Sequence, residues 1–555
     1  MSTPVRPCGQ SRVRLGDLRQ MTTIDTHAGA SAGAAHPNPV ARMAAWIISS
    51  DHKKIGRLLI GESMVAAVAA AVIGALLGIE RMSSGYGIFH GDAAPQLVAL
   101  FRYLLALGVL APLTLGLALA VVPMQVGSRA VSFPRLAQFG FWAWDLGSVV
   151  VIVSIIGNGG PGGGNTDLVD MYLLGVGVAV LGLCAVAVSV ATTVLTSRAP
   201  GMTTDLVPVF SWGGLVGSVA AALSLPVLVG TIAYLYIDHT YAATAFGGNK
   251  GIDEWTRFAF TQPATFVFAA IAVAVLAEIA PVVAGTRQPL RGPALAGVGL
   301  VTTGLLGAVT QSHHVLDTDG GFADTVKSAI PYLLFNGLPV LGVLVVLGAS
   351  LFVVKSGKPK VSTSFAFALL GTLMVLLGML GTMLQNIKAT GLTGTAIEEG
   401  ATTFVVYGAV MVVIGGLLHW SPKLWGVVVA DKKALPLVGL ALLGTVLASL
   451  PNYIAGFADQ PLDAADGFGY SGPMGLWNAL VAVGHVMVAL SVIAVALAIL
   501  ASVRSGAPAP DDPWNGHTLE WAIPSPAPHN NFASLATVGS AEPVLDAKPK
   551  SEVSA

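Results

Sequence analysis

Two adjacent histidines, His313 and His314, are the residues of this chain best suited to bind a metal ion. Imidazole nitrogens are common metal ligands, but neighbouring residues on a helix point about 100° apart. The pair can therefore close a metal site only with a third ligand, for which Gln262 and His239 are the candidates. The alternative is a helix-end pair that is hydrogen-bonded to the loop containing Asp317.

A second group of candidates consists of ionisable side chains inside long apolar stretches. A charge there is costly and usually faces a partner or a cavity. The group comprises Glu62, Arg102, Asp145, Glu278 and His485. We consider Glu278, Asp145 and Arg102 as a candidate ion relay. The structural alternatives are a neutral or paired carboxyl for Glu278, carboxyls near the membrane interface for Asp145 and Glu62, an ion pair for Arg102, and a hydrogen-bonded packing role for His485.

Composition indicates the elements that must position these groups. The chain has 555 residues, of which 54% are hydrophobic and 10% charged, a balance typical of membrane proteins. A helix needs about 20 apolar residues to cross a bilayer. Twelve weakly charged stretches fit: 55–80, 96–125, 136–157, 168–196, 206–236, 262–286, 293–312, 325–354, 364–387, 400–421, 434–455 and 473–503. The sequence therefore predicts an all-α integral membrane bundle of twelve transmembrane helices.

The distribution of charge predicts how this bundle is organised. We expect a disordered N-terminal tail over residues 1–50, a membrane domain over 51–505 and a C-terminal tail over 506–555. Lys and Arg gather in the loops on the side of both tails, so both termini are expected to face the cytoplasm across the cell membrane. Met1 and Met21 both remain candidate start residues.

Two classes of function are not supported by the composition. The formal net charge of −1 provides no basic footprint for nucleic acid. The two cysteines, Cys8 and Cys184, are too far apart in the sequence for a CxxC metal or redox motif. Membrane lipid and other membrane subunits are the partners we expect.

Several motifs, in order along residues 50–533, resemble subunit I of the haem-copper oxidases, the cytochrome c oxidase subunit I family. The motifs are SDHKKIG (50–56), VVPMQVG (121–127), SFPRL (132–136), RAPGMT (198–203), IDHTYAATAF (237–246), the histidine pair, WSPKLWG (420–426) and DPWNGHTLEWAIPSPAPHNNF (512–532). The Pro-rich string around TLEW is the most specific of them. The resemblance implies twelve core helices, both termini in the cytoplasm, and haem and copper between the helices.

The resemblance also implies six metal-binding histidines, and most of these positions hold other residues here. The chain contains 11 His in all. Counting from neighbouring motifs places Phe101 at the first low-spin haem ligand, Gly400 at the high-spin ligand and Thr402 at the second low-spin ligand. None of these side chains can bind haem iron, because axial ligation needs a donor such as imidazole.

The copper site is only partly retained in the same comparison. Gln262 stands at the first copper histidine and Phe266 at the cross-linked tyrosine, whereas His313 and His314, 51 residues after Gln262, match the remaining copper pair. The arginines that bind the haem propionates fall at Asn452 and Tyr453. We therefore expect no haem, and copper only as a residual site at the histidine pair.

Three functions follow from these observations. The first is a haem-free, non-catalytic relative of subunit I that acts as a subunit or scaffold of a respiratory-type membrane complex. The second is a functional terminal oxidase, an enzyme that passes electrons from cytochrome c to oxygen and pumps protons. The third is an ion or small-molecule transporter that uses the emptied haem cavities. Haem and metal content separates the first from the second, and ion flux after substitution of Glu278 tests the third.

Overall fold

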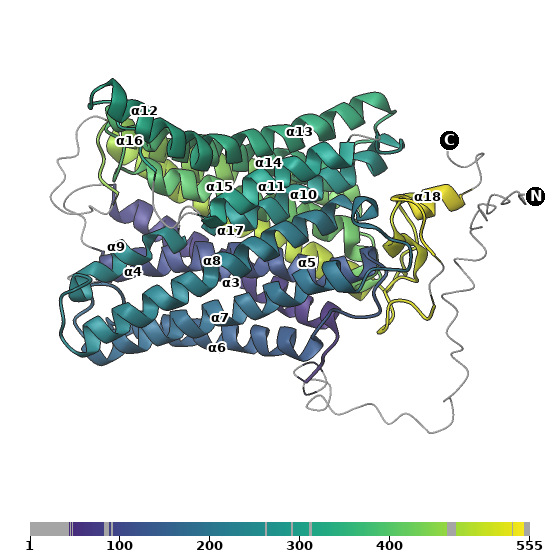
Figure 1. The fold of residues 1–555 in the computed structure, drawn as a ribbon, viewed down its shortest axis with the longest axis horizontal. Coiled ribbons are helices and arrows are strands. Elements are labelled where there is room, and N and C mark those ends of the chain that lie inside the picture. The colour runs from purple at the N-terminus through teal and green to yellow at the C-terminus, as the bar shows by residue number, and fades with distance from the viewer. Residues whose placement is uncertain are drawn as a thin grey trace, which may run out of the picture.

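The computed structural model describes residues 44, 46, 48–82, 88–89, 93–260, 264–289, 292–309, 314–462, 473–534 and 537–548. Its long helices lie side by side in one bundle (Figure 1). Within these residues, eleven helices or continuous helical runs are long and apolar enough to cross a membrane, and one further apolar helix is shorter. The predicted all-α bundle of twelve membrane helices is confirmed, with a helix at each predicted span.

The membrane helices follow one another in the order of the chain. They are α3 (His52–Glu80), the run of α4 (Ala93–Tyr103), η1 (Leu104–Leu110) and α5 (Ala111–Gln125), α6 (Pro134–Ile156), α7 (Thr166–Thr196), α8 (Val209–Thr240), α9 (Gly248–Phe260) with α10 (Ala264–Ala284), the shorter α11 (Gly292–Val309), the run of α12 (Phe322–Tyr332), η3 (Leu333–Gly337) and α13 (Leu338–Ser356), α14 (Thr363–Gln385), α15 (Ile397–Trp425), α16 (Asp431–Phe457) and α17 (Met474–Ser505). Short helices η2 (Thr204–Leu206), η4 (Lys388–Thr390), η5 (Leu519–Ala522) and α18 (Pro543–Ala547) lie in the connections and near the C-terminus.

Local sequence sets where several of these helices begin and end. The side chains of Asp51, Asn165 and Ser362 each accept a hydrogen bond from a backbone N–H in the first turn of α3, α7 and α14. These are the residue types that satisfy the free N–H groups of a helix start. Gly426 ends α15 with a left-handed backbone conformation, φ 73°, which glycine adopts without strain.

Glycines allow neighbouring helices to pack closely. A Cβ atom added to Gly140 of α6 would lie 2.6 Å from the carbonyl oxygen of Gly182 on α7, and one added to Gly371 of α14 would lie 2.6 Å from that of Gly408 on α15. Association of helices in lipid depends on such van der Waals contact, because lipid tails are as apolar as the side chains. These glycines therefore allow α6 to pack closely on α7 and α14 on α15.

Three helical runs form the centre of the bundle. The most apolar windows of the α4 to α5 run, the α9 to α10 run and α15 are 100%, 94% and 94% buried, against 33–61% for the other spans. The outer helices expose large apolar side chains, among them Leu146 and Phe352. Side chains at the centre are thus shielded from lipid by other helices, and any internal site must be built there.

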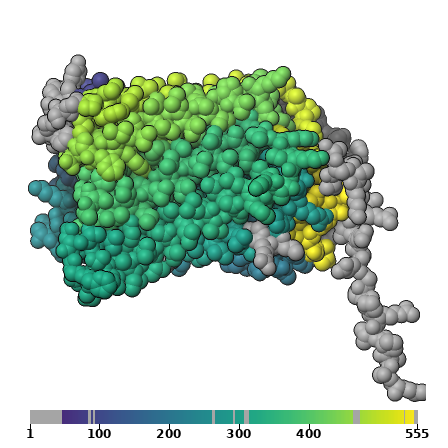
Figure 2. Space-filling view, turned by 90° about the horizontal axis from the view of Figure 1, so that it is seen from above, coloured from purple at the N-terminus to yellow at the C-terminus, as the bar shows by residue number. Residues whose placement is uncertain are grey.

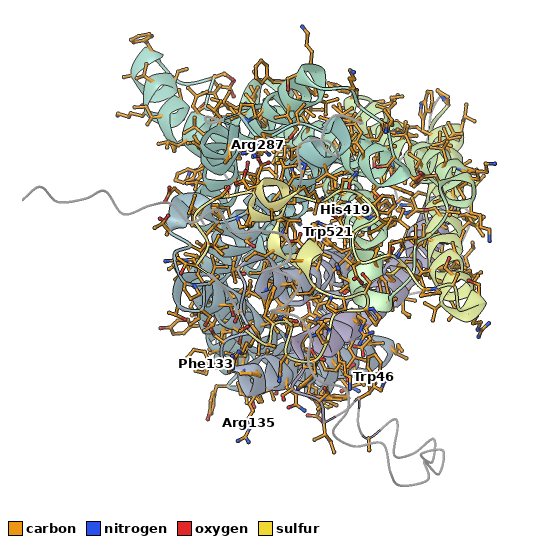
Figure 3. All side chains as sticks on the ribbon, turned by 90° about the vertical axis from the view of Figure 1, so that its right-hand side faces the viewer. Trp46, Phe133, Arg135, Arg287, His419 and Trp521 are labelled. Atoms are coloured by element: carbon orange, nitrogen blue, oxygen red, sulfur yellow. The ribbon has the colours of Figure 1, made fainter. Side chains whose placement is uncertain are left out.

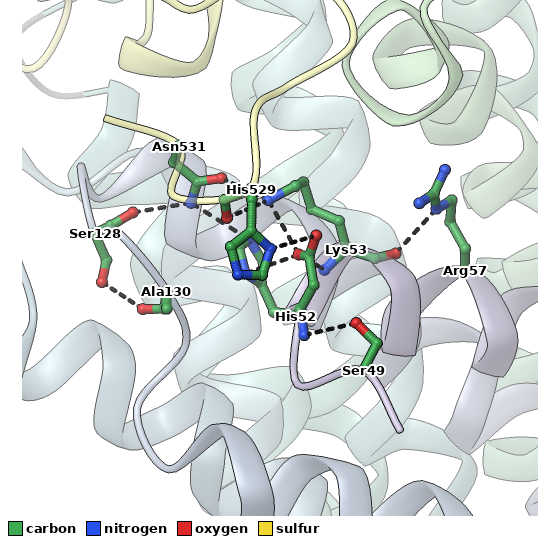
Figure 4. Close-up of polar contacts among 9 residues, drawn as sticks. Ser49, His52, Lys53, Arg57, Ser128, Ala130, His529 and Asn531 are labelled. Carbon is green, nitrogen blue, oxygen red and sulfur yellow. Dashed lines mark hydrogen bonds and ion pairs between the residues drawn. The ribbon is translucent and has the colours of Figure 1, made fainter. Parts of the chain in front are cut away.

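The residues after α17 cover one end of the bundle. We call the described residues 507–534 and 537–548 the C-terminal cap, and the end on which they lie the terminal end (Figures 1 and 2). Lys53, at the start of α3, donates hydrogen bonds to the carbonyl oxygen of His529 at 3.1 Å and to Asn531 at 3.0 Å. Asn531 also donates to the Ser128 carbonyl at 2.9 Å (Figure 4). Two of the sequence motifs, SDHKKIG and the C-terminal string, therefore contact each other across 478 residues.

Candidate functional site

Aromatic side chains fill the space beside the position assigned to the first haem ligand. Phe101 is 1% exposed, and its ring meets that of His485 edge-on with the centroids 5.5 Å apart. His485 Nδ1 is hydrogen-bonded to the Tyr407 hydroxyl at 2.9 Å. The imidazole rests against Gly74 of α3, where an added Cβ would lie 2.6 Å from the ring. His485 therefore has the packing role, with a hydrogen bond, that its isolation in the sequence suggested.

Gly400 and Thr402, the positions on α15 assigned to haem ligands, have different surroundings. A Cβ added to Gly400 would lie 2.8 Å from the Ser449 carbonyl oxygen, 2.9 Å from the Tyr453 ring and 3.0 Å from Asn452, all on α16. Position 400 thus faces a closely packed helix and has no room for an imidazole without movement of α16. Thr402 is partly exposed.

The positions assigned to the propionate-binding arginines take part in the same packing. The Tyr453 hydroxyl donates to the Leu377 carbonyl at 2.9 Å, and its ring meets Phe404 edge-on. Asn452 is buried and donates to the carbonyl oxygen of Ala448, one turn earlier on α16, at 3.4 Å. Both side chains therefore bond to backbone of the bundle.

Only part of the candidate copper site lies within the described residues. Gln262 and His313 lie outside them. The His314 ring stacks on Phe335 with the centroids 4.5 Å apart. His239, the other candidate third ligand, is hydrogen-bonded through Nδ1 to Asp170 at 2.8 Å. Phe266, assigned to the tyrosine position, is 1% exposed on α10.

The end of the bundle opposite the cap contains a buried ion pair that the sequence did not reveal. Arg81, just after α3, makes two parallel hydrogen bonds to Glu399 in the first turn of α15, at 2.9 and 3.1 Å. The side chains are 4% and 8% exposed. Arg81 also donates to the Leu462 carbonyl at 3.3 Å. The pair therefore joins three segments that are far apart in the sequence.

The residues of the candidate ion relay do not come together. Arg102 forms an ion pair with Asp253 of α9 at 3.2 Å, near the end opposite the cap. Asp145 is hydrogen-bonded to Glu62, which joins α6 to α3. Both of these carboxyls lie about three turns inside their helices. Glu278 lies elsewhere, beneath the C-terminal cap.

Glu278 is buried at the terminal end of α10. Its carboxylate accepts hydrogen bonds from the backbone N–H of Phe210, at 2.9 Å, and from the hydroxyl of Thr518 in the cap, at 3.4 Å. Phe210 lies in the first turn of α8, where free N–H groups favour an anion. The carboxyl of Glu278 thus connects two membrane helices to the cap.

A second carboxyl, Glu520, enters the bundle from the cap and is fully buried. It accepts hydrogen bonds from Gln125 of α5 at 3.0 Å and from the Trp420 indole at 3.2 Å. Burial raises the pKa of the Glu520 carboxyl above its ordinary value, while the hydrogen bond from Gln125 acts in the opposite direction. The motif TLEW contained this residue, but nothing in its composition indicated burial.

Aromatic and basic side chains of α15 complete the contact with the cap. Figure 3 looks onto the terminal end, with His419 and Trp521 near its middle. Lys423 is buried, donates to the Asp511 carbonyl at 2.7 Å and lies over the Trp521 ring at 5.4 Å. His419 stacks on Trp514 of the cap. The cap is therefore an integral part of the structure at this end.

Comparison with known proteins identifies relatives over nearly the whole chain. Residues 54–493 match the family model described as cytochrome C and quinol oxidase polypeptide I. Cytochrome c oxidase subunit 1 of Corynebacterium diphtheriae is 26% identical and that of Bacillus subtilis 25%, each covering 90% of this chain, with 92% and 82% of the relative matched. A solved heme-copper terminal oxidase dimer superposes with a TM-score of 0.59 at 15% identity, over 83% of this chain and 85% of the other. That likeness concerns the fold.

Proposed function

Because this chain belongs to the cytochrome C and quinol oxidase polypeptide I family, and is a multi-pass membrane protein of that fold, we propose that it is a haem-free, non-catalytic member. It would act as a subunit or scaffold of a respiratory-type complex in the cell membrane, with both termini in the cytoplasm.

The packing at Gly400 is the observation that carries this proposal. A high-spin haem needs an axial donor from this position of α15, whereas the backbone here lies directly against α16. Gly400 has no side chain, and a Cβ would already lie 2.8 Å from the Ser449 carbonyl. The residues present do not fit a haem at this place.

The surroundings of Phe101 support the same conclusion independently. Phe101, Tyr407 and His485 are each at most 1% exposed and pack on one another where a haem would require open volume. A phenyl ring has no lone pair to donate to iron. His485 bonds to Tyr407 through Nδ1, and its Nε2, which has no hydrogen-bond partner among the described residues, faces Gly74 of α3, where an added Cβ would lie 2.7 Å from it.

The C-terminal cap supports a role within a complex. It covers the terminal end and connects α3, α5, α10 and α15 through buried hydrogen bonds. Lys53 of α3, Gln125 of α5 and Lys423 of α15 donate to the cap, and Glu278 of α10 accepts from it. Its outer face is thus held in a fixed conformation by the bundle beneath. A rigid polar surface beside a membrane is suited to binding another subunit without a large loss of entropy.

Isolation of the chain from its native membranes in a mild detergent tests the proposal. We expect other membrane subunits in fixed stoichiometry, and any oxygen uptake from reduced cytochrome c to be unchanged by His313→Ala and His314→Ala. A chain that migrates alone, or oxygen uptake that these substitutions abolish, would contradict the proposal.

A functional terminal oxidase is the second candidate, because the relatives at 25–26% identity carry the name cytochrome c oxidase subunit 1. This function would need haem ligands from residues other than Phe101, Gly400 and Thr402. The oxygen-uptake measurement separates the two functions, since the oxidase depends on the metal centre and the scaffold does not.

A further inference from the structure

A small cavity lies between the membrane helices and the C-terminal cap. Its volume is about 40 Å³, and its polar lining consists of Glu278, Gln288, His517, Thr518 and Glu542. A water molecule needs roughly 10–15 Å³ of such space and two or more polar partners. The cavity can therefore hold water in contact with the Glu278 carboxyl.

Glu278 and Glu520 are linked through the start of α8. Consecutive residues at the start of α8 serve both: Phe210 donates to Glu278 at 2.9 Å, and Ser211 donates at 2.8 Å to Gln125, the amide that holds Glu520. The two carboxyls are close enough for a charge on one to repel a charge on the other. They form one electrostatic unit beneath the cap.

No cation forms an ion pair with this unit within the described residues, although the charge of Lys423 is near enough to interact with Glu520. Among them, no Lys, Arg or His lies within ion-pairing distance of Glu278 or Glu520. The neighbouring cation, Lys423, donates instead to backbone carbonyls of the cap, and the neighbouring His517 pairs with Glu542 at 3.1 Å.

One oxygen of the unit is left without a hydrogen-bond partner. Glu520 is fully buried, and its Oε2 atom has no partner among the described residues. A buried carboxylate oxygen without a donor is costly, whereas a protonated carboxyl supplies its own donor. Two adjacent carboxyls without a cation cannot both ionise easily. A proton on this carboxyl would remove the need for an external donor.

We propose that Glu278 and Glu520 form a proton-binding pair, which holds one proton and exchanges it with the terminal-end solvent through the adjoining cavity. The ligand is a proton, and the site is complete only when the cap supplies Glu520. This site is independent of haem and copper, and it stands whether or not the chain is an oxidase.

Infrared spectroscopy of the full chain, grown with carbon-13 glutamate, detects the proton directly. The carbonyl stretch of a protonated glutamic acid is separate from that of a carboxylate and shifts with the label. We expect wild type to keep a protonated glutamate band at neutral pH. Glu278→Gln and Glu520→Gln should each lower the pH at which that band disappears, because the remaining acid no longer has a charged neighbour. Glu254→Gln, an exposed glutamate at the opposite end, is the matched control and should change nothing in this band.

A second variant keeps the test decisive if removal of either acid impairs folding. Gln125→Met retains both carboxyls but removes the donor to Glu520, so the band should persist to a pH higher by roughly one unit. The proposal is overturned if neither acid variant changes the glutamate band, or if Gln125→Met leaves its titration unmoved. Replacing sodium by choline should not move the midpoint, and a sodium-dependent midpoint would indicate a metal-cation site instead.

Discussion

Removal of the buried Arg81–Glu399 ion pair should be strongly destabilising if one partner is left behind. Arg81→Met leaves the Glu399 carboxylate with an exposed fraction of 8% and without its two hydrogen bonds at 2.9 and 3.1 Å. Breaking a buried pair in this way costs about 3–5 kcal/mol, because an uncompensated charge remains in a region of low dielectric constant. We therefore expect the free energy of unfolding to fall by about that amount.

A double-mutant cycle isolates this interaction from the loss of packing. The double variant Arg81→Met with Glu399→Leu removes both charges, and it should be much closer to wild type than the single variant, because replacing both members of a buried pair is often nearly neutral. Denaturant titration followed by tryptophan fluorescence in detergent measures each variant. The control is Arg257→Met, whose pair with Asp253 is 30% and 33% exposed and should contribute at most about 1 kcal/mol. The reasoning would be refuted if the losses of stability in Arg81→Met and Glu399→Leu add up to the loss in the double variant.

Three further predictions concern packing, the cap and pH. Gly74→Ala should cost about 1–3 kcal/mol, because the new methyl group would overlap the His485 ring, whereas Gly61→Ala, with open space around it, should be almost neutral; thermal unfolding of the two variants tests this. Lys53→Met removes the two hydrogen bonds to the cap at 3.1 and 3.0 Å, so limited proteolysis should cleave the cap at least several-fold faster than in wild type, and an unchanged rate would contradict the contact. Because burial raises the pKa of Glu520, the folded state binds this proton more tightly than the unfolded state, and stability should fall as pH rises from the ordinary glutamate range through the folded-state pKa; Glu520→Gln should flatten that fall in melting temperature measured against pH.

The membrane fold could be predicted from the sequence because its signal is local. A crossing helix needs about 20 consecutive apolar residues, and each of the twelve stretches satisfies this alone. Even α11, whose apolar segment is too short to count among the eleven long spans, lies at the predicted span 293–312. Helix ends such as Asp51 before α3 depend on hydrogen bonds within one turn, which short sequence patterns also contain.

The internal contacts could not be predicted because they join residues far apart in the chain. Arg81 and Glu399 are 318 residues apart in the sequence. His485 stood alone in the sequence, while its partner Tyr407 lies 78 residues earlier on another helix. Each contact depends on which faces of two helices meet. A central helix is apolar on all sides, so its sequence pattern does not indicate which face meets which neighbour.

The C-terminal cap shows how composition can mislead. Its proline-rich, polar sequence is typical of an exposed tail, yet Glu520 is fully buried. The buried carboxyl accepts hydrogen bonds from Gln125 and Trp420, which lie on different helices. A polar segment can enter a membrane protein at its end when the helices beneath supply the hydrogen bonds that water would otherwise provide.

The haem content of the purified chain tests the central claim most directly. A reduced-minus-oxidised absorption spectrum, combined with metal analysis, measures haem and copper together on the same sample. We predict no haem band, and the copper value shows whether His313 and His314 retain a metal. Haem in stoichiometric amount would contradict the account, because it would require axial ligands that Phe101, Gly400 and Thr402 do not supply.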